Sequence, residues 1–152
     1  MRIAGHPVHP ALVHFPVAFW SLASILDGLV ITSVMHETLL AWYCHVLGLV
    51  MAVPALFTGW LEFARLEQRI VAPAMRHMML MGSAWICYLA ALFTRTVHLV
   101  PIQAPGGITY FFSAIGFLLL MWGGWQGGEL VYRHGAGSMI DSSHDDASST
   151  TR

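Results

Sequence analysis

The sequence predicts an all-α protein, a four-helix transmembrane bundle with up-down topology. Of its 152 residues, 57% are hydrophobic and only 10% are charged, whereas soluble domains contain about 45–50% apolar and about 25% charged residues. Four apolar runs are each long enough to cross a bilayer, which takes roughly 20 residues of helix. The segments between them are short, so we expect consecutive helices to lie antiparallel beside one another.

The first expected helix, Pro10–Val34, follows a segment in which prolines alternate with histidines. Because proline disfavours helical geometry in the residue that precedes it, we expect His6 and His9 to lie on an extended segment. The second expected helix, Thr38–Phe63, begins after a short loop around His36. Both runs are apolar enough to be predicted as transmembrane helices.

The third expected helix is Pro73–Val97, and the fourth is Thr109–Tyr132. Their preceding connections, Arg65–Val71 and Pro101–Gly107, contain charged residues in one case and prolines and glycines in the other, as is typical of helix boundaries. The sequence therefore predicts one four-helix membrane domain.

After the fourth helix the composition changes to small residues and then to a Ser/Asp/Thr-rich segment. Such a polar segment cannot bury enough apolar surface to fold. We therefore expect the membrane domain to cover residues 1–135 and a disordered tail to cover residues 136–152.

The arginines predict the orientation of the bundle. Face one is the side of the membrane with both termini and the second-to-third connection, and face two is the opposite side. Face two has Arg95 alone, whereas face one has Arg2, Arg65, Arg69, Arg76 and Arg133. Cytoplasmic loops carry an excess of Lys and Arg, so face one and both termini are predicted to be cytoplasmic. The net charge of −1 leaves no basic surface for nucleic acid.

Histidines are the most informative polar residues, because ionisable groups within a membrane span indicate a functional site. His14 and His77 are predicted to lie roughly 6–9 Å below face one on different helices, at about 1.5 Å per residue. Two imidazoles at one depth that face the bundle interior can supply both axial ligands of a haem b. Small residues on the same helix faces suit either a flat cofactor or close helix packing alone.

Other residues near face one extend this candidate site. His9 and His134 are predicted to be substitute ligands or partners of the axial histidines. Glu62 and Glu129 are predicted to accept the second N–H of a ligating imidazole. Arg133 follows Glu129 by one helical turn and can form an ion pair with it.

A second candidate pair, His45 and His98, lies toward face two. His98 follows His77 by about 32 Å of helix, which places it at the membrane interface. The depths of His45 and His98 therefore differ, and a second haem between them is the weaker hypothesis.

The residues alone leave three functions open. The first is electron transfer by a haem protein, with a quinone or another redox protein as partner. The second is binding or transport of a transition metal by the histidines and carboxylates near face one. The third is a structural or assembly subunit without a ligand. A homo-oligomer is compatible with each, and motifs such as Gly-x-Ser-x-Gly or His-Glu-x-x-His do not occur, so the sequence leaves enzymatic activity undecided.

Three segments resemble a known family. They are GHPVHPALVHFP at residues 5–16, VPALFTGWLE at residues 53–62 and GWQGGELVYRHG at residues 124–135. Together they resemble the bacterial membrane family labelled domain of unknown function 2231, in which many members carry a histidine at the position of His77. The resemblance implies a four-helix protein of the bacterial inner membrane. Some members are fused to Rieske iron–sulfur or cytochrome c modules, which implies a redox setting and favours haem.

Overall fold

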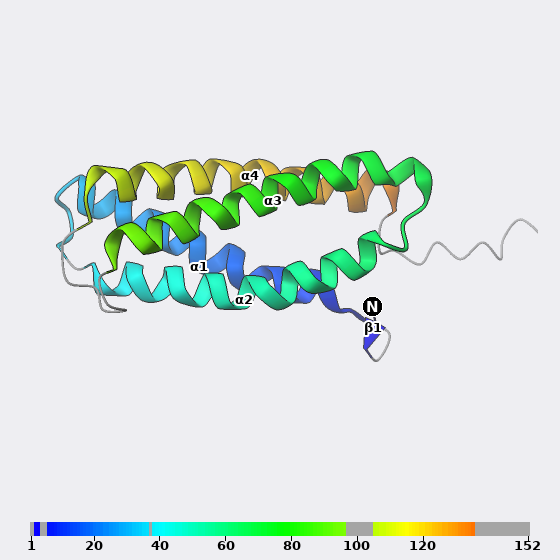
Figure 1. The fold of residues 1–152 in the computed structure, drawn as a ribbon, viewed down its shortest axis with the longest axis horizontal. Helices are drawn as coiled ribbons and strands as arrows, with labels where there is room; N and C mark the ends of the chain where they lie inside the picture. Colours follow the sequence, from blue (N-terminus) through cyan, green and yellow to red (C-terminus); the bar gives the residue numbers. More distant parts are fainter. Residues whose placement is uncertain (1, 4–5, 37, 97–104, 136–152) are drawn as a thin grey trace, which may run out of the picture.

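The structure, a computed structural model, describes residues 2–3, 6–36, 38–96 and 105–135. Its helices are α1 (Val8–Ile31), α2 (Leu39–Phe63), α3 (Gln68–Arg95) and α4 (Gly107–His134), and a short antiparallel pair, β1 (Arg2–Ile3) and β2 (His6–Pro7), precedes them. Figure 1 shows two antiparallel hairpins, α1 with α2 and α3 with α4, that lie side by side along the bundle. The predicted all-α up-down bundle is confirmed.

All four helices are long and apolar enough to span a membrane. Each contains a window with a mean hydropathy between 1.4 and 1.9. The outer surface of the bundle carries large apolar side chains on every helix, among them Ile25, Val50, Ile86 and Leu118. Such a surface suits contact with acyl chains rather than with water.

Two helix starts differ from the sequence-based expectation. α1 begins at Val8, so His9 lies in its first turn and not on an extended segment. Pro10 is tolerated there because the N–H groups of the first turn have no partner within the helix. α3 begins at Gln68 and continues through Pro73. The early start is stabilised by a small apolar cluster in which Ile70 packs with Leu130 of α4.

Parts of two expectations lie outside the described residues. Residues 97–104 include the expected end of the third helix, most of the connection before the fourth, and His98. The tail at residues 136–152, expected to be disordered, is also outside the described part of the chain.

The two hairpins place equivalent residues in equivalent positions. Trp20 of α1 stacks on Tyr88 of α3 with ring centroids 4.7 Å apart and an angle of 10° between the ring planes. Trp20 also lies against Gly48 of α2, and Tyr88 lies against Gly116 of α4. Trp20 and Tyr88 are 68 residues apart in the sequence, and the same interval separates the two glycines.

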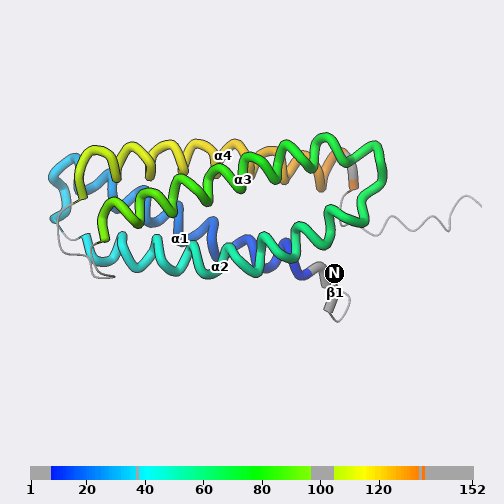
Figure 2. Tube along the Cα trace, in the orientation of Figure 1, coloured from blue at the N-terminus to red at the C-terminus, as the bar shows by residue number. Residues whose placement is uncertain are grey.

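This equivalence extends to the arrangement of the helices. The Cα trace in Figure 2 shows that each hairpin consists of two closely paired helices. The stack of Trp20 on Tyr88 joins the first helix of one hairpin to the first helix of the other. These contacts are those of two structural repeats related by an approximate two-fold axis along the bundle, a relationship known from membrane proteins with parallel repeats.

Candidate functional site

His9 is held by α2. Its Nδ1 donates a hydrogen bond of 2.9 Å to the backbone carbonyl of Ala55. A Cβ atom at Gly59, one turn farther along α2, would lie 2.8 Å from Cε1 of the His9 imidazole. Glycine at position 59 therefore makes the space in which this imidazole lies against the helix.

His77 has the same environment in the second hairpin. Its Nδ1 donates a hydrogen bond of 2.8 Å to the backbone carbonyl of Gly123 in α4. A Cβ atom at Gly127, one turn farther along, would lie 2.9 Å from Cε1 of His77. In both hairpins the histidine and its carbonyl partner are 46 residues apart, so the two imidazoles are equivalent in the repeat.

The hydrogen bonds determine which ring nitrogen carries the proton. A carbonyl oxygen can only accept, so Nδ1 must be the donor in both rings. In a neutral imidazole Nε2 then keeps its lone pair, and no hydrogen bond among the described residues uses Nε2 of His9 or His77. Both side chains are only partly buried.

His14 is not part of this pair, contrary to the expectation that it faces the interior. It lies on the exposed outer surface of α1. The buried residues of α1 are Pro16, Trp20, Ala23, Leu26 and Asp27. The sequence-based interpretation took the small residues of α1 as the inner face, whereas the inner face carries the large Trp20, whose indole lies against Gly48. The structure thus places His9, not His14, at the position of α1 that is equivalent to His77 of α3.

The remaining predicted residues near face one have other surroundings. Arg133 and Glu129 form the expected ion pair, with 2.6 Å between Nη1 and Oε1. The Nδ1 atoms of His9 and His77 donate to backbone carbonyls, not to the expected carboxylates of Glu62 or Glu129. The side chain of His134 is outside the described part of the structure.

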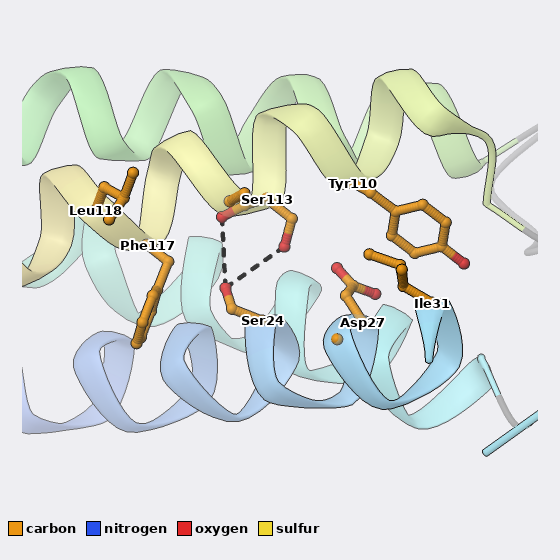
Figure 3. A pocket seen from close by; sticks show the side chains of 9 residues that line it. Ser24, Asp27, Ile31, Tyr110, Ser113, Phe117 and Leu118 are labelled. Atoms are coloured by element: carbon orange, nitrogen blue, oxygen red, sulfur yellow. Dashed lines mark hydrogen bonds between the residues drawn. The ribbon is translucent and has the colours of Figure 1, made fainter. Parts of the chain in front are cut away.

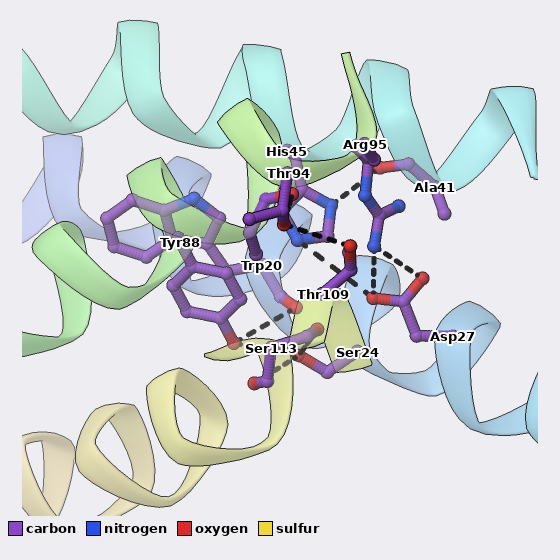
Figure 4. Close-up of polar contacts among 11 residues, drawn as sticks. Trp20, Ser24, Asp27, Ala41, His45, Tyr88, Thr94, Arg95, Thr109 and Ser113 are labelled. Atoms are coloured by element: carbon purple, nitrogen blue, oxygen red, sulfur yellow. Dashed lines mark hydrogen bonds and ion pairs between the residues drawn. The ribbon is translucent and has the colours of Figure 1, made fainter. Parts of the chain in front are cut away.

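A second polar centre lies in the half of the bundle toward face two. Asp27 of α1 and Arg95 of α3 are 3% and 4% exposed. Nη2 of Arg95 donates to both carboxylate oxygens of Asp27, at 2.9 and 2.7 Å. The two residues are 68 positions apart, so the ion pair joins equivalent positions of the two hairpins, as the Trp20–Tyr88 stack does (Figure 4).

His45 of α2 completes this centre and is fully buried. Its Nδ1 donates to the carbonyl of Ala41 at 2.8 Å, and its Nε2 lies 4.0 Å from Oδ2 of Asp27. Among the described residues, Nε2 of His45 and both Nε and Nη1 of Arg95 have no hydrogen-bond partner. The predicted pairing of His45 with His98 remains a prediction, because His98 lies outside the described residues.

Hydroxyl groups of α1, α3 and α4 form a second set of hydrogen bonds in this half of the bundle. The Tyr88 hydroxyl and Ser24 Oγ are 2.8 Å apart, and Ser24 Oγ is 3.4 Å from Ser113 Oγ. The Tyr88 hydroxyl also donates to the carbonyl of Trp20 at 3.3 Å. All four helices therefore contribute polar side chains to this half of the bundle.

Comparison with protein families gives one match. The family described as a predicted membrane protein, domain of unknown function 2231 (DUF2231), matches residues 5–139. The chain belongs to this family. No curated protein and no solved structure gives a match. The DUF2231 match includes all four helices, the pair His9 and His77, and the buried Asp27–Arg95 centre.

Two features of this DUF2231 protein escaped the sequence-based reasoning. The ion pair of Asp27 with Arg95 was not expected, because Arg95 was counted as the single arginine of face two. The equivalence of His9 with His77 was also missed. One signal connects them: each pair is separated by the same 68 residues as Gly48 and Gly116. A comparison of the sequence with itself at that interval aligns His9 with His77 and Gly48 with Gly116.

Proposed function

We propose that this membrane protein binds one b-type haem between its two hairpins, with His9 and His77 as axial ligands, and transfers electrons. The observation that carries the proposal is the matched pair of imidazoles, each with Nδ1–H bound to a backbone carbonyl. Metal-ligating histidines characteristically donate their second N–H in this way, which fixes the ring and leaves Nε2 for the metal.

The number of available side chains favours haem over a bare metal ion. A mononuclear metal site built from protein alone commonly takes three or four side-chain ligands. Among the described residues, no group of three or more His, Cys, Asp or Glu side chains is arranged to hold a metal ion. Haem needs only two axial residues, because the porphyrin supplies four nitrogens.

Ligation by two histidines favours electron transfer over catalysis at the iron. With both axial positions filled by His9 and His77, no position is open for a substrate. The apolar environment within a bundle of this kind also controls the reduction potential through burial and the surrounding charges. A membrane quinone or another redox protein would be the electron partner.

The proposal includes the orientation in the inner membrane, with face one cytoplasmic. Arg95, the single arginine assigned to face two, is buried against Asp27. It therefore no longer counts as a loop charge, and the arginine bias toward face one becomes stronger. Single cysteines at Arg65 and Ser33, in a background without Cys44 and Cys87, test this. The cysteine at position 65 should be labelled only from the cytoplasm, and the opposite result would reverse the orientation.

The haem is tested by purifying the full chain in mild detergent from haem-replete cells. We expect a Soret band, a sharp α band after reduction with dithionite, and close to one haem per chain in a pyridine haemochrome assay. Metal analysis of the same sample measures iron, copper and zinc. A colourless protein that contains copper or zinc would favour the histidine-based metal site instead, and a protein without either would favour a structural subunit.

Variants identify the ligands. His9→Ala and His77→Ala should each lose most of the haem, whereas His14→Ala should keep it, because His14 lies on the outer surface. Helix content by circular dichroism and the elution volume in gel filtration show whether each variant folds. Full haem content in either His9→Ala or His77→Ala would exclude that residue as a ligand.

A further inference from the structure

A cavity of about 280 Å³ lies between α1 and α4, in the half of the membrane toward face two. Its volume is near the lower end of small-molecule sites, which range over about 300–1,000 Å³. Figure 3 shows side chains from both helices around it, including Ser24 and Asp27 from α1 and Ser113 from α4. It is separate from the pair His9 and His77, since Asp27 follows His9 by roughly 27 Å along α1.

The walls of this cavity differ in polarity. Ser24, Asp27 and Ser113 form its inner, polar wall, and Ile31, Phe117 and Leu118 contribute apolar side chains. Ile31 and Leu118 are 57% and 63% exposed on the outside of the bundle, where a membrane protein contacts acyl chains. An occupant therefore reaches the polar wall from within the bilayer, and it must combine a small polar head with an apolar body.

The polar wall favours an occupant that can donate a hydrogen bond. Asp27 lines the cavity, whereas its ion-pair partner Arg95 does not. Both oxygens of Asp27 accept from Arg95, but each oxygen keeps a further lone pair. A hydroxyl group is suited to this wall, while the anionic phosphate of a phospholipid would meet a carboxylate of the same charge.

The aromatic side chains of Tyr110 and Phe117 also line the cavity. Aromatic rings pack well against other flat rings in offset or edge-to-face geometry. A flat ring with hydroxyl groups and an apolar tail can donate to the polar wall, pack against the aromatic rings and contact the apolar side chains. From this combination we infer that the cavity binds the head group of a membrane quinol, with Asp27 accepting a hydrogen bond from one of its hydroxyls.

His45 gives this site a second proton acceptor. Its Nε2 lies 4.0 Å from Oδ2 of Asp27 and, among the described residues, has no hydrogen-bond partner. Because Nδ1 of His45 donates to the Ala41 carbonyl, Nε2 of the neutral ring carries the lone pair. Asp27 thus lies between the cavity and a buried base. The assignment of a quinol rests on the proposed function, in which a membrane quinone is the electron partner, whereas its binding to the cavity does not require haem.

Gly28 offers a way to fill the cavity without altering the polar wall. It lines the cavity, and a Cβ atom there would meet nothing within 4 Å. Gly28→Leu therefore places a side chain into the space that the quinol ring would take, and it also improves helix propensity. Gly82→Leu is the matched control, because Gly82 has the same open surroundings but lies on α3, outside the cavity.

The test uses the full chain in phosphatidylcholine nanodiscs and an azido-benzoquinol with a short alkyl tail, kept in the reduced state, as a photo-label. We expect labelled peptides from α1 and α4 near Ile31 and Phe117, and competition by decyl-benzoquinol. Labelling of Gly28→Leu should fall about ten-fold, which corresponds to about 1.4 kcal/mol, while Gly82→Leu should be labelled like the wild type. Undiminished labelling of Gly28→Leu, or labels spread evenly over the lipid-facing surface, would overturn the proposal.

Two further measurements distinguish quinol from phospholipid as the occupant and separate the quinol site from the haem proposal. Native mass spectrometry shows whether a phospholipid is retained, and a bound phospholipid that decyl-benzoquinol does not displace would also overturn the proposal. The labelling is repeated with His9→Ala, which lacks the proposed haem ligand. Site-specific labelling of this variant is expected, and it would keep the quinol site valid even if the haem proposal failed. Loss of labelling in a folded His9→Ala protein would show that the cavity does not bind quinol by itself.

Discussion

The indole ring of Trp20 and the phenol ring of Tyr88 stack nearly parallel, 4.7 Å apart between centroids, at equivalent positions of the two hairpins. Both rings belong to the central core cluster. Around them, each ring lies against a glycine of its own hairpin, Gly48 or Gly116. The stack is therefore one of the contacts that join the two repeats, and it lies near the middle of the bundle.

The first prediction separates the ring of Tyr88 from its hydroxyl. Tyr88→Phe keeps the stack but loses the hydrogen bonds with Ser24 and with the Trp20 carbonyl, so unfolding should become easier by about 0.5–1.5 kcal/mol. Tyr88→Ala also removes the ring and should cost about 3–5 kcal/mol. Unfolding in mixed micelles with increasing SDS measures both. Equal effects of the two substitutions would show that the stack contributes nothing.

The second prediction concerns the close approach at Gly48. A Cβ atom at this position would overlap the indole of Trp20, so Gly48→Ala should destabilise the protein by about 1–3 kcal/mol through overpacking. Gly82→Ala is the control, since nothing lies within 4 Å of a Cβ there. That variant should be as stable as the wild type or more so, because alanine favours helix over glycine. Thermal unfolding in detergent compares them, and equal melting temperatures would contradict the packing at Gly48.

The sequence predicts the fold well because hydropathy and length decide it. The four spans and their antiparallel order follow from the apolar runs and from the short connections between them. The starts of α1 and α3 were less well predicted, because tertiary packing at Ile70 and the tolerance of a first helical turn for Pro10 outweighed the local preference of proline.

The candidate site was predicted only in part, for a physical reason. His77 was predicted to face the bundle interior, and its imidazole lies against Gly123 of α4, but its expected partner depended on the rotation of α1. A stripe of small residues was taken as the inner face of α1, whereas Trp20 is the residue that packs inward. The pairing of Asp27 with Arg95 depends on two helices that are 68 residues apart, and no local pattern specifies such a contact.

The third prediction concerns the buried ion pair. Asp27→Ala or Arg95→Ala leaves one uncompensated charge inside the bundle and should destabilise it by about 3–5 kcal/mol. The double variant Asp27→Leu with Arg95→Met removes both charges and should recover most of that stability. A double-mutant cycle of unfolding free energies, from Asp27→Ala, Arg95→Ala and the double alanine variant, measures the coupling between them. Additive effects would show that the two side chains do not interact in the folded protein.

The fourth prediction rests on the haem proposal and uses neighbouring glycines. Gly127→Ala forces the His77 imidazole to move, because the new Cβ would lie 2.9 Å from its Cε1, whereas Gly128→Ala meets nothing within 4 Å. We expect Gly127→Ala to release haem to apomyoglobin at least about ten-fold faster than wild type, consistent with the usual effect of disturbing the surroundings of a metal ligand. Gly59→Ala should do the same through His9. Equal rates of haem release from Gly127→Ala and Gly128→Ala would exclude His77 as a haem ligand that Gly127 holds in position.

The fifth prediction follows from the two repeats. If each hairpin is a unit, a chain divided between Leu66 and Glu67, in the connection from α2 to α3, should reassemble when both halves are produced together. Each half buries its own helix pair, and the stack of Trp20 on Tyr88 together with the ion pair of Asp27 and Arg95 joins the halves.

Co-purification of an untagged second half with a tagged first half measures the reassembly. Arg95→Ala in the second half should weaken it, because Asp27 of the first half would then be buried without a counter-charge. Arg69→Ala is the control, since Arg69 forms an exposed pair with Glu67 in its own half, and exposed pairs contribute little. Two halves that fold but never associate would show that the intact connection, rather than the contacts between the repeats, holds the bundle together.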